Sequence, residues 1–276
     1  MIFAAVLVLA SVAPNADAAN APDVVCRDTF QQGALIRCQT APDSRVTWDG
    51  KSIAIASDGS FVFGIDWKAE SGTLDIEKAI SGTDTVLRAT KTYMFDPRQY
   101  KTEIVNGLPP KTVDVPDSWK KRRAIENGKV RKGRAAITPD TFWAAEFARP
   151  ATGRISGVFG SHRILNGKPR SAHYGLDIAN DTGTPVFAPA GGMITLAAPD
   201  FLLEGGIVII DHGFGVTSTL FHMNSVDVGE GQRIKQGDQI GTIGATGRAT
   251  GPHVDWRVNW KSVRLDPQLL ISDETK

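Results

Sequence analysis

Alternating apolar and polar positions predict several short strands in the first third of the chain. Residues 45–48, 52–56 and 61–67 alternate, and an Asp-Gly pair separates each run from the next. An Asp-Gly pair between alternating runs is a strong signal for a tight hairpin turn. Several short strands at this spacing predict a small β-sandwich-like domain, which we assign to residues 19–96.

The pattern changes over residues 97–149, where Leu108-Pro109-Pro110 interrupts regular structure and the charge becomes basic. The segment 111–134 holds nine Lys and Arg residues against three acidic ones. Ser118 is placed to cap a helix that begins near Trp119. We therefore predict a linker with one helix. This helix is either solvated or, because a basic cluster concentrates polyanions, in contact with an anionic polymer.

Residues 150–276 again predict strands, now interrupted by many glycines. The apolar run 207–210 is typical of a buried strand, and the turn 211–215 leads into another strand, 216–222. Residues 231–238 and 240–244 give a further strand–turn–strand pattern. The predicted fold class is therefore mainly β, and all five histidines of the protein lie in this last region.

Length and charge limit the classes of function. A chain of 276 residues is long enough for two ordinary domains. Its 31 basic and 30 acidic side chains leave a net charge of +1. Because no protein-wide field attracts a polyanion, we expect no nucleic-acid partner.

The first 18 residues are typical of a secretory signal peptide. The apolar stretch 2–13 is too short to cross a bilayer, and Ala16-Asp17-Ala18 offers small residues for cleavage near Ala18. The usual positive charge is missing, since the first basic residue is Arg27, so a buried N-terminal segment is the alternative. No later apolar run approaches the roughly 20 residues of a membrane helix. We expect an exported, soluble protein with no integral membrane segment.

Cys26 and Cys38 are the only cysteines, and their spacing does not match a C-x-x-C redox or zinc motif. In an exported protein a disulfide is favoured, and it would contribute about 3 kcal/mol in the loop-entropy model. Two buried free thiols are the alternative.

The segment 253–260, HVDWRVNW, alternates without a break. On a strand the side chains of residues i and i+2 point to the same face, so His253 and Asp255 project side by side. Valine and tryptophan occupy the other face and are expected to pack in the core. An ordinary half-exposed strand has the same alternation, so the pattern alone does not establish a site.

His173 and Asp177 supply a second pair of candidate metal ligands. Gly175 and the turn 181–185 disfavour a continuous helix, so we expect the pair on a loop that runs into a strand. Imidazole and carboxylate groups both suit zinc, and three protein ligands plus a water molecule make a catalytic rather than a structural site. A lone histidine is more often structural, which is the interpretation that local sequence favours for the remaining three: His162, His212 and His222.

Taken together, these motifs resemble those of the lysostaphin/LytM-type zinc metallopeptidases. The matching pieces occur in order over residues 150–270, and they are 173–177, 184–186, 211–213, 221–223 and 246–253. The resemblance implies a C-terminal β domain with a catalytic groove, the duplicated hybrid motif. It also implies an enzyme of the periplasm or cell envelope that hydrolyses cross-links or stem peptides of peptidoglycan.

By the same resemblance, His173 and Asp177 correspond to the first two zinc ligands, and His222 and His253 to two catalytic histidines. Asp255 stands where most members have histidine as the third ligand. Aspartate still binds zinc, but a second carboxylate should make the ion a weaker Lewis acid and raise the pKa of its water. This predicts a rate that increases toward alkaline pH.

The resemblance leaves two functions open. One is a zinc endopeptidase acting on peptidoglycan. The other follows from members of the family that have lost zinc ligands and activate separate cell-wall amidases, which would make an amidase or an envelope complex the partner. We favour the enzyme, because the usual histidine ligand is replaced at position 255 by aspartate, which also binds zinc, and not by a residue that cannot bind a metal.

Overall fold

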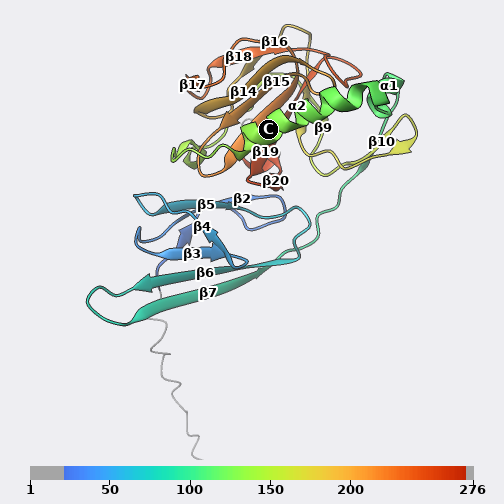
Figure 1. Cartoon of the computed structure of the whole chain (residues 1–276). Coiled ribbons are helices and arrows are strands. Elements are labelled where there is room, and N and C mark those ends of the chain that lie inside the picture. The colour runs from blue at the N-terminus through green and yellow to red at the C-terminus, as the bar shows by residue number, and fades with distance from the viewer. Residues whose placement is uncertain (1–21, 272–276) are drawn as a thin grey trace, which may run out of the picture.

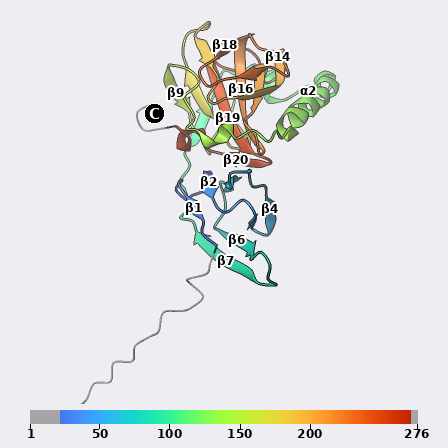
Figure 2. The same ribbon diagram turned by 90° about the vertical axis from the view of Figure 1, so that its left-hand side faces the viewer.

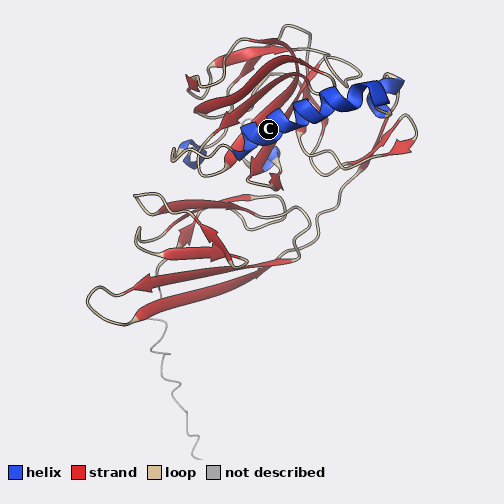
Figure 3. Cartoon of the chain, in the orientation of Figure 1, coloured by secondary structure: helices blue, strands red, loops and turns tan. Residues whose placement is uncertain are grey.

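The computed structural model describes residues 22–271. The predicted signal peptide, residues 1–18, lies outside the described residues. The chain is mainly β, as predicted, and folds into two β-rich parts joined by a segment that contains the main helix (Figures 1 and 3). Within residues 22–271, no helix combines the length and apolar character needed to span a membrane.

The N-terminal part consists of two small antiparallel sheets, with strand orders β1-β2-β5 and β4-β3-β6-β7. Their strands are β1 (Val25–Cys26), β2 (Leu35–Gln39), β3 (Arg45–Trp48), β4 (Lys51–Ile53), β5 (Ser60–Gly64), β6 (Ser71–Ala79) and β7 (Val86–Met94). The Asp49-Gly50 turn joins β3 to β4, with φ angles of 50° and 71°. Trp48 stacks on Phe63 with 4.5 Å between ring centroids, which packs one sheet against the other.

Cys26 and Cys38 form a disulfide. They are direct partners on the paired strands β1 and β2, so the bond links two neighbouring strands. The alternative of two free thiols is therefore excluded.

The C-terminal part is built around one antiparallel sheet with the strand order β17-β14-β15-β16-β19-β12-β9. These strands are β9 (Arg154–Gly157), β12 (Leu176–Ala179), β14 (Gly192–Phe201), β15 (Gly205–Asp211), β16 (Val216–Val226), β17 (Arg233–Ile234) and β19 (His253–Trp260). Off this path, β13 (Pro185–Phe187) pairs with β18 (Gln239–Ile243), and β20 (Val263–Leu265) pairs with β19. The segment 253–260 is therefore a strand, as predicted, and Val254, Trp256 and Val258 are fully buried.

The predicted helix is α2 (Asp117–Ala135), which lies across one face of the large sheet (Figures 1 and 2). It begins after Pro116, and no side chain caps it, so the predicted capping role of Ser118 is wrong. Asp117 instead places a carboxylate in the first turn, where it stabilises the positive end of the helix. Val130 packs against a cluster on the sheet that includes Ile209. The helix is thus attached to the C-terminal part.

The segment before α2 is also attached to the C-terminal part. β8 (Thr102–Val105) pairs in parallel with β10 (His162–Leu165), and β10 pairs with β11 (Lys168–Pro169). The short helix α1 (Pro110–Val113) follows, and Leu108, Val113 and Leu165 form a small hydrophobic cluster. Two 3-10 turns, Phe142–Ala144 and Pro267–Leu269, complete the elements within residues 22–271.

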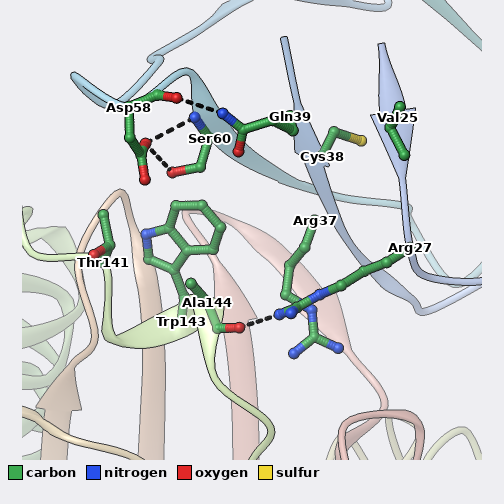
Figure 4. A pocket seen from close by; sticks show the side chains of 10 residues that line it. All are labelled: Val25, Arg27, Arg37, Cys38, Gln39, Asp58, Ser60, Thr141, Trp143 and Ala144. Carbon is green, nitrogen blue, oxygen red and sulfur yellow. Dashed lines mark hydrogen bonds between the residues drawn. The ribbon is translucent and has the colours of Figure 1, made fainter.

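The two parts of the chain contact each other around Arg27 and Arg37 (Figure 4). Arg27 donates a hydrogen bond to the carbonyl oxygen of Ala144, and Arg37 donates to that of Ala145 at 2.9 Å. A pocket between the parts is lined by these arginines and by Trp143. No described histidine lines this pocket, so the chemistry that the sequence predicts lies elsewhere.

Candidate metal centre and active site

His173, Asp177 and Asp255 come together where β12 pairs with β19. Asp177 lies directly opposite Asp255 in the register of the two strands. His173 lies in the loop before β12, so the first pair does sit on a loop that runs into a strand. One ligand atom from each residue lies within 4.8 Å of the others, and all three residues are buried. The structure thus brings together the three residues that the sequence singled out as metal ligands.

The polar atoms of this group suit a divalent cation. Nε2 of His173 lies 3.0 Å from Oδ1 of Asp177, but neither atom, nor Nδ1 of His173, makes a hydrogen bond. Buried polar atoms nearly always have a partner, so these neighbouring unpartnered atoms favour a ligand set over a purely structural cluster. One imidazole and two carboxylates are donors typical of zinc.

Gly175 makes room for the third carboxylate. A Cβ atom at this position would overlap Oδ1 of Asp255 and would lie 2.8 Å from the backbone oxygen of Trp256. A Cβ atom at Gly157 would likewise overlap Oδ2 of Asp177. Each carboxylate therefore occupies space that a side chain on the neighbouring glycine would fill. This explains why a glycine, Gly175, lies between His173 and Asp177.

Each carboxylate also has an arginine partner. Arg163 on β10 donates to Oδ2 of Asp177 at 2.5 Å, and Arg257 on β19 donates to Oδ2 of Asp255 at 2.6 Å. Burial raises the pKa of Asp177, but His173 and Arg163 lower it by more. Burial likewise raises the pKa of Asp255, and Arg257 and His173 outweigh that effect. Both carboxylates are therefore ionised at neutral pH.

The sequence motifs described above assign no role to these arginines. Arg257 had a usable signal, because it shares the polar face of the 253–260 strand with His253 and Asp255. Arg163 had none, because β10 was not predicted and its partner strand β8 lies some sixty residues earlier in the chain.

His222 and His253 face each other beside the ligand group, with 4.7 Å between ring centroids. Nδ1 of His222 lies 2.9 Å from the carbonyl oxygen of Thr246, and Nδ1 of His253 lies 2.9 Å from that of Gly251. A carbonyl oxygen only accepts, so each Nδ1 carries a hydrogen, and Nε2 is left as the ring nitrogen that can take up or release a proton. Both rings are therefore oriented for proton transfer at Nε2.

The backbone of His222 has a φ of 64°, a left-handed conformation that non-glycine residues rarely adopt. Such conformations concentrate at functional sites. Burial and, to a smaller extent, the neighbouring His253 lower the pKa of His222 to about 4. The ring is therefore neutral at neutral pH, and its position beside His253 favours a functional role over the structural one that local sequence suggested.

The other two histidines lie outside this group. His212 is fully buried, with Nδ1 2.6 Å from the carbonyl oxygen of Gly191 and Nε2 2.8 Å from Oγ of Ser218. It is a hydrogen-bonded core residue. His162 is exposed on β10.

A cavity of about 140 Å³ opens beside the candidate ligand group and the two facing histidines. Asp177, His222 and His253 line it from the large sheet, and Arg248 lines it from the loop before β19. Glu103 on β8 lines the facing side and accepts a hydrogen bond from Oγ of Ser161 at 2.7 Å. The segment that joins the two parts of the chain, which includes β8, thus forms one wall of this cavity.

Known proteins are similar to this chain over the region that holds the candidate site. Residues 171–267 match the family described as peptidase family M23. A crystal structure of a Pseudomonas aeruginosa protein assigned to peptidase M23 superposes with a TM-score of 0.60 at 26% identity, covering 91% of this chain and 94% of that one. This similarity extends beyond the C-terminal part.

Two curated relatives are similar over shorter stretches. The cell division protein DipM of Caulobacter vibrioides is 32% identical over 132 residues, 46% of this chain and 21% of DipM. The peptidoglycan DD-endopeptidase ShyA of Vibrio cholerae is 34% identical over 106 residues, 38% of this chain and 24% of ShyA. The matched region is thus less than a quarter of either relative.

Proposed function

Because residues 171–267 match the model of peptidase family M23, we propose that this protein is an exported zinc endopeptidase that cuts peptide bonds in peptidoglycan. The observation that carries the proposal is the buried group of His173, Asp177 and Asp255 beside the facing imidazoles of His222 and His253. The name of the relative ShyA, a peptidoglycan DD-endopeptidase, supports the substrate class. This substrate would place the protein in the periplasm or cell envelope, which agrees with the predicted signal peptide.

In the proposed mechanism His173, Asp177 and Asp255 would hold the metal. Bound zinc would polarise the scissile carbonyl group and activate a water molecule. His222 and His253 present Nε2 as acceptors, so one of them would take the proton that the water loses, and the pair would then return this same proton to the nitrogen of the leaving amine. Two imidazolium ions so close together would repel each other, so the pair carries one proton at a time. This sharing suits alternating base and acid roles.

Arg163 and Arg257 act as positioning residues. Each binds one carboxylate of the ligand group and so restricts its rotation. Their positive charges also offset the second carboxylate that Asp255 introduces. The weakening of the metal as a Lewis acid is therefore smaller than the ligand set alone suggests.

The test combines metal analysis with digestion of purified peptidoglycan. One zinc ion per chain and new peptide-bond cleavage products are expected, and both should be lost in His173→Ala. His162→Ala is the matched control, because this histidine is exposed and lies outside the ligand group. Cleavage that persists in His173→Ala would contradict the proposal.

One observation favours the second candidate, a non-catalytic activator of a cell-wall amidase. Arg257 donates to both carboxylate oxygens of Asp255 through Nε, and again to Oδ2 through Nη2. Asp255 therefore has hydrogen-bond partners even without a metal. Purified protein that contains no zinc but stimulates an amidase would support this candidate.

A further inference from the structure

Another cavity, of about 530 Å³, has a charged lining that is entirely basic. Arg131 and Arg134 line it from α2, Lys261 lines it from the turn after β19, and Arg264 lines it from β20. Asn259 and Ser262 add uncharged polar groups, and no described aspartate or glutamate lines it. Four cations around one cavity create a local positive potential on a protein that is nearly neutral overall.

These cations have no acidic partners within the described part of the chain. Nε of Arg134 donates to the hydroxyl oxygen of Thr219 at 3.2 Å. The guanidinium of Arg264 lies 3.6 Å from the ring centroid of Tyr174, and Nζ of Lys261 lies 4.7 Å from that of Trp260. Burial, together with the nearby Arg257 and Arg264, lowers the pKa of Arg134 to about 10. Arg134 stays charged at neutral pH, so a bound anion would relieve this mutual repulsion.

The cavity lies on the same face of the large sheet as the candidate active site. His253, Asp255, Arg257 and Asn259 alternate along β19, so their side chains share that face. Asn259, which lines the basic cavity, comes four residues after Asp255, or about 13 Å along the strand. On the neighbouring β16, Thr219 pairs with Arg257 and contacts Arg134. Arg257 and Arg134 therefore lie one after the other along the path from the candidate ligand Asp255 to the cavity.

We propose that this basic cavity is a substrate subsite that binds a free carboxylate of the peptidoglycan peptide beyond the bond that is cut. The inference rests on the proposed function and adds a determinant of substrate choice. An extended peptide advances about 3.3–3.6 Å per residue, so a carboxylate within about four residues of the cleaved bond reaches the cavity. The guanidinium fork matches a carboxylate with two parallel hydrogen bonds.

The test measures the Kd of a soluble, uncleaved muropeptide with free carboxylates and of the same muropeptide with its carboxylates amidated. Arg134→Gln and Arg264→Gln should each weaken binding of the free form about tenfold and leave the amidated form nearly unchanged. Arg131→Gln is an independent test, because this exposed side chain lines the cavity without packing in the core. Lys132→Gln, at the next position of α2 and outside the cavity, is the matched control.

Equal affinity for the free and amidated forms, or unchanged affinity in all three arginine variants, would overturn the inference. Polyphosphate that binds more tightly than the muropeptide, and loses affinity in the same variants, would reassign the cavity to a phosphate polymer and also overturn it. On cleavable substrate the arginine variants should raise KM and leave kcat unchanged. Selective binding by a protein that lacks zinc and cuts nothing would sustain the subsite and reject the endopeptidase.

Discussion

One face of the large sheet carries the candidate metal centre at one end and the basic cavity at the other. Among the described residues, charged side chains are paired with opposite charges at the first end and unpaired at the second. At the candidate metal centre each carboxylate is paired with an arginine, Asp177 with Arg163 and Asp255 with Arg257. At the basic cavity no described carboxylate accompanies the cations. Paired charges hold side chains in a defined geometry, whereas unpaired ones are available to a ligand. The contrast separates a preorganised catalytic end from an end suited to binding.

The largest expected effect follows from removing Asp255. Asp255→Ala should weaken zinc binding by more than about 100-fold, since even outer-shell partners contribute 10- to 100-fold. It should also lower the free energy of unfolding by about 3 kcal/mol, because Arg257 is left largely buried without its partner. Metal analysis and chemical denaturation measure the two effects.

The double variant Asp255→Ala/Arg257→Leu separates the two roles of Asp255. It should regain much of the lost stability but none of the lost zinc, because it removes the unpaired charge without restoring a ligand. Zinc content that stays normal in both variants would show that Asp255 serves only the ion pair.

A histidine in the core beneath this face should make the fold sensitive to acid. Burial lowers the pKa of His212 to about 4, from about 6.5 in the unfolded chain. The unfolded state therefore takes up the proton first, and stability that is complete above pH 6.5 falls by about 3 kcal/mol on reaching pH 4. Denaturation at pH 7 and at pH 4.5 should show a smaller difference for His212→Gln than for the unmodified protein. An equal difference would mean that other groups, such as His222, account for the loss.

Gly175→Ala should reduce activity while leaving every candidate ligand in place. The added methyl group overlaps Oδ1 of Asp255, and a displacement of about 1 Å at an active site can cost about 100-fold in rate. Gly229→Ala is the matched control, because a Cβ atom there has open space around it. Comparable kcat/KM values for the two variants would contradict the close packing of Asp255 against the loop.

The smallest effect is expected from the arginine that binds Asp177. Arg163→Gln should weaken zinc binding about tenfold, because it releases one oxygen of a ligand without removing the ligand. The loss of its charge should also steepen the increase in rate toward alkaline pH that the ligand set predicts. A pH–rate profile from pH 7 to pH 9 for both proteins checks this, and parallel profiles would mean that the charge of Arg163 has no influence on the site.

Much of the site could be predicted from local patterns. The alternation over 253–260 is a strand in the structure and places His253 and Asp255 on one face, because strand geometry depends on neighbouring residues alone. The loop with His173 and Gly175 was predicted for the same local reason. The true start of α2 is two residues earlier than the predicted one, and its capping residue differs, because Pro116, whose ring fixes φ (here −69°), is the extended residue that directly precedes the helix.

The sequence by itself determined the mainly β fold, the five candidate site residues and the resemblance to a zinc peptidase family, since each depends on residue type and short-range spacing. Only the tertiary structure decided how charges are paired. Arg163 reaches Asp177 because β10 joins β8, and four cations surround one cavity because α2 lies beside β19 and β20. Such contacts join segments that are distant in sequence, and Coulomb interactions depend on distance in space, which no local pattern contains.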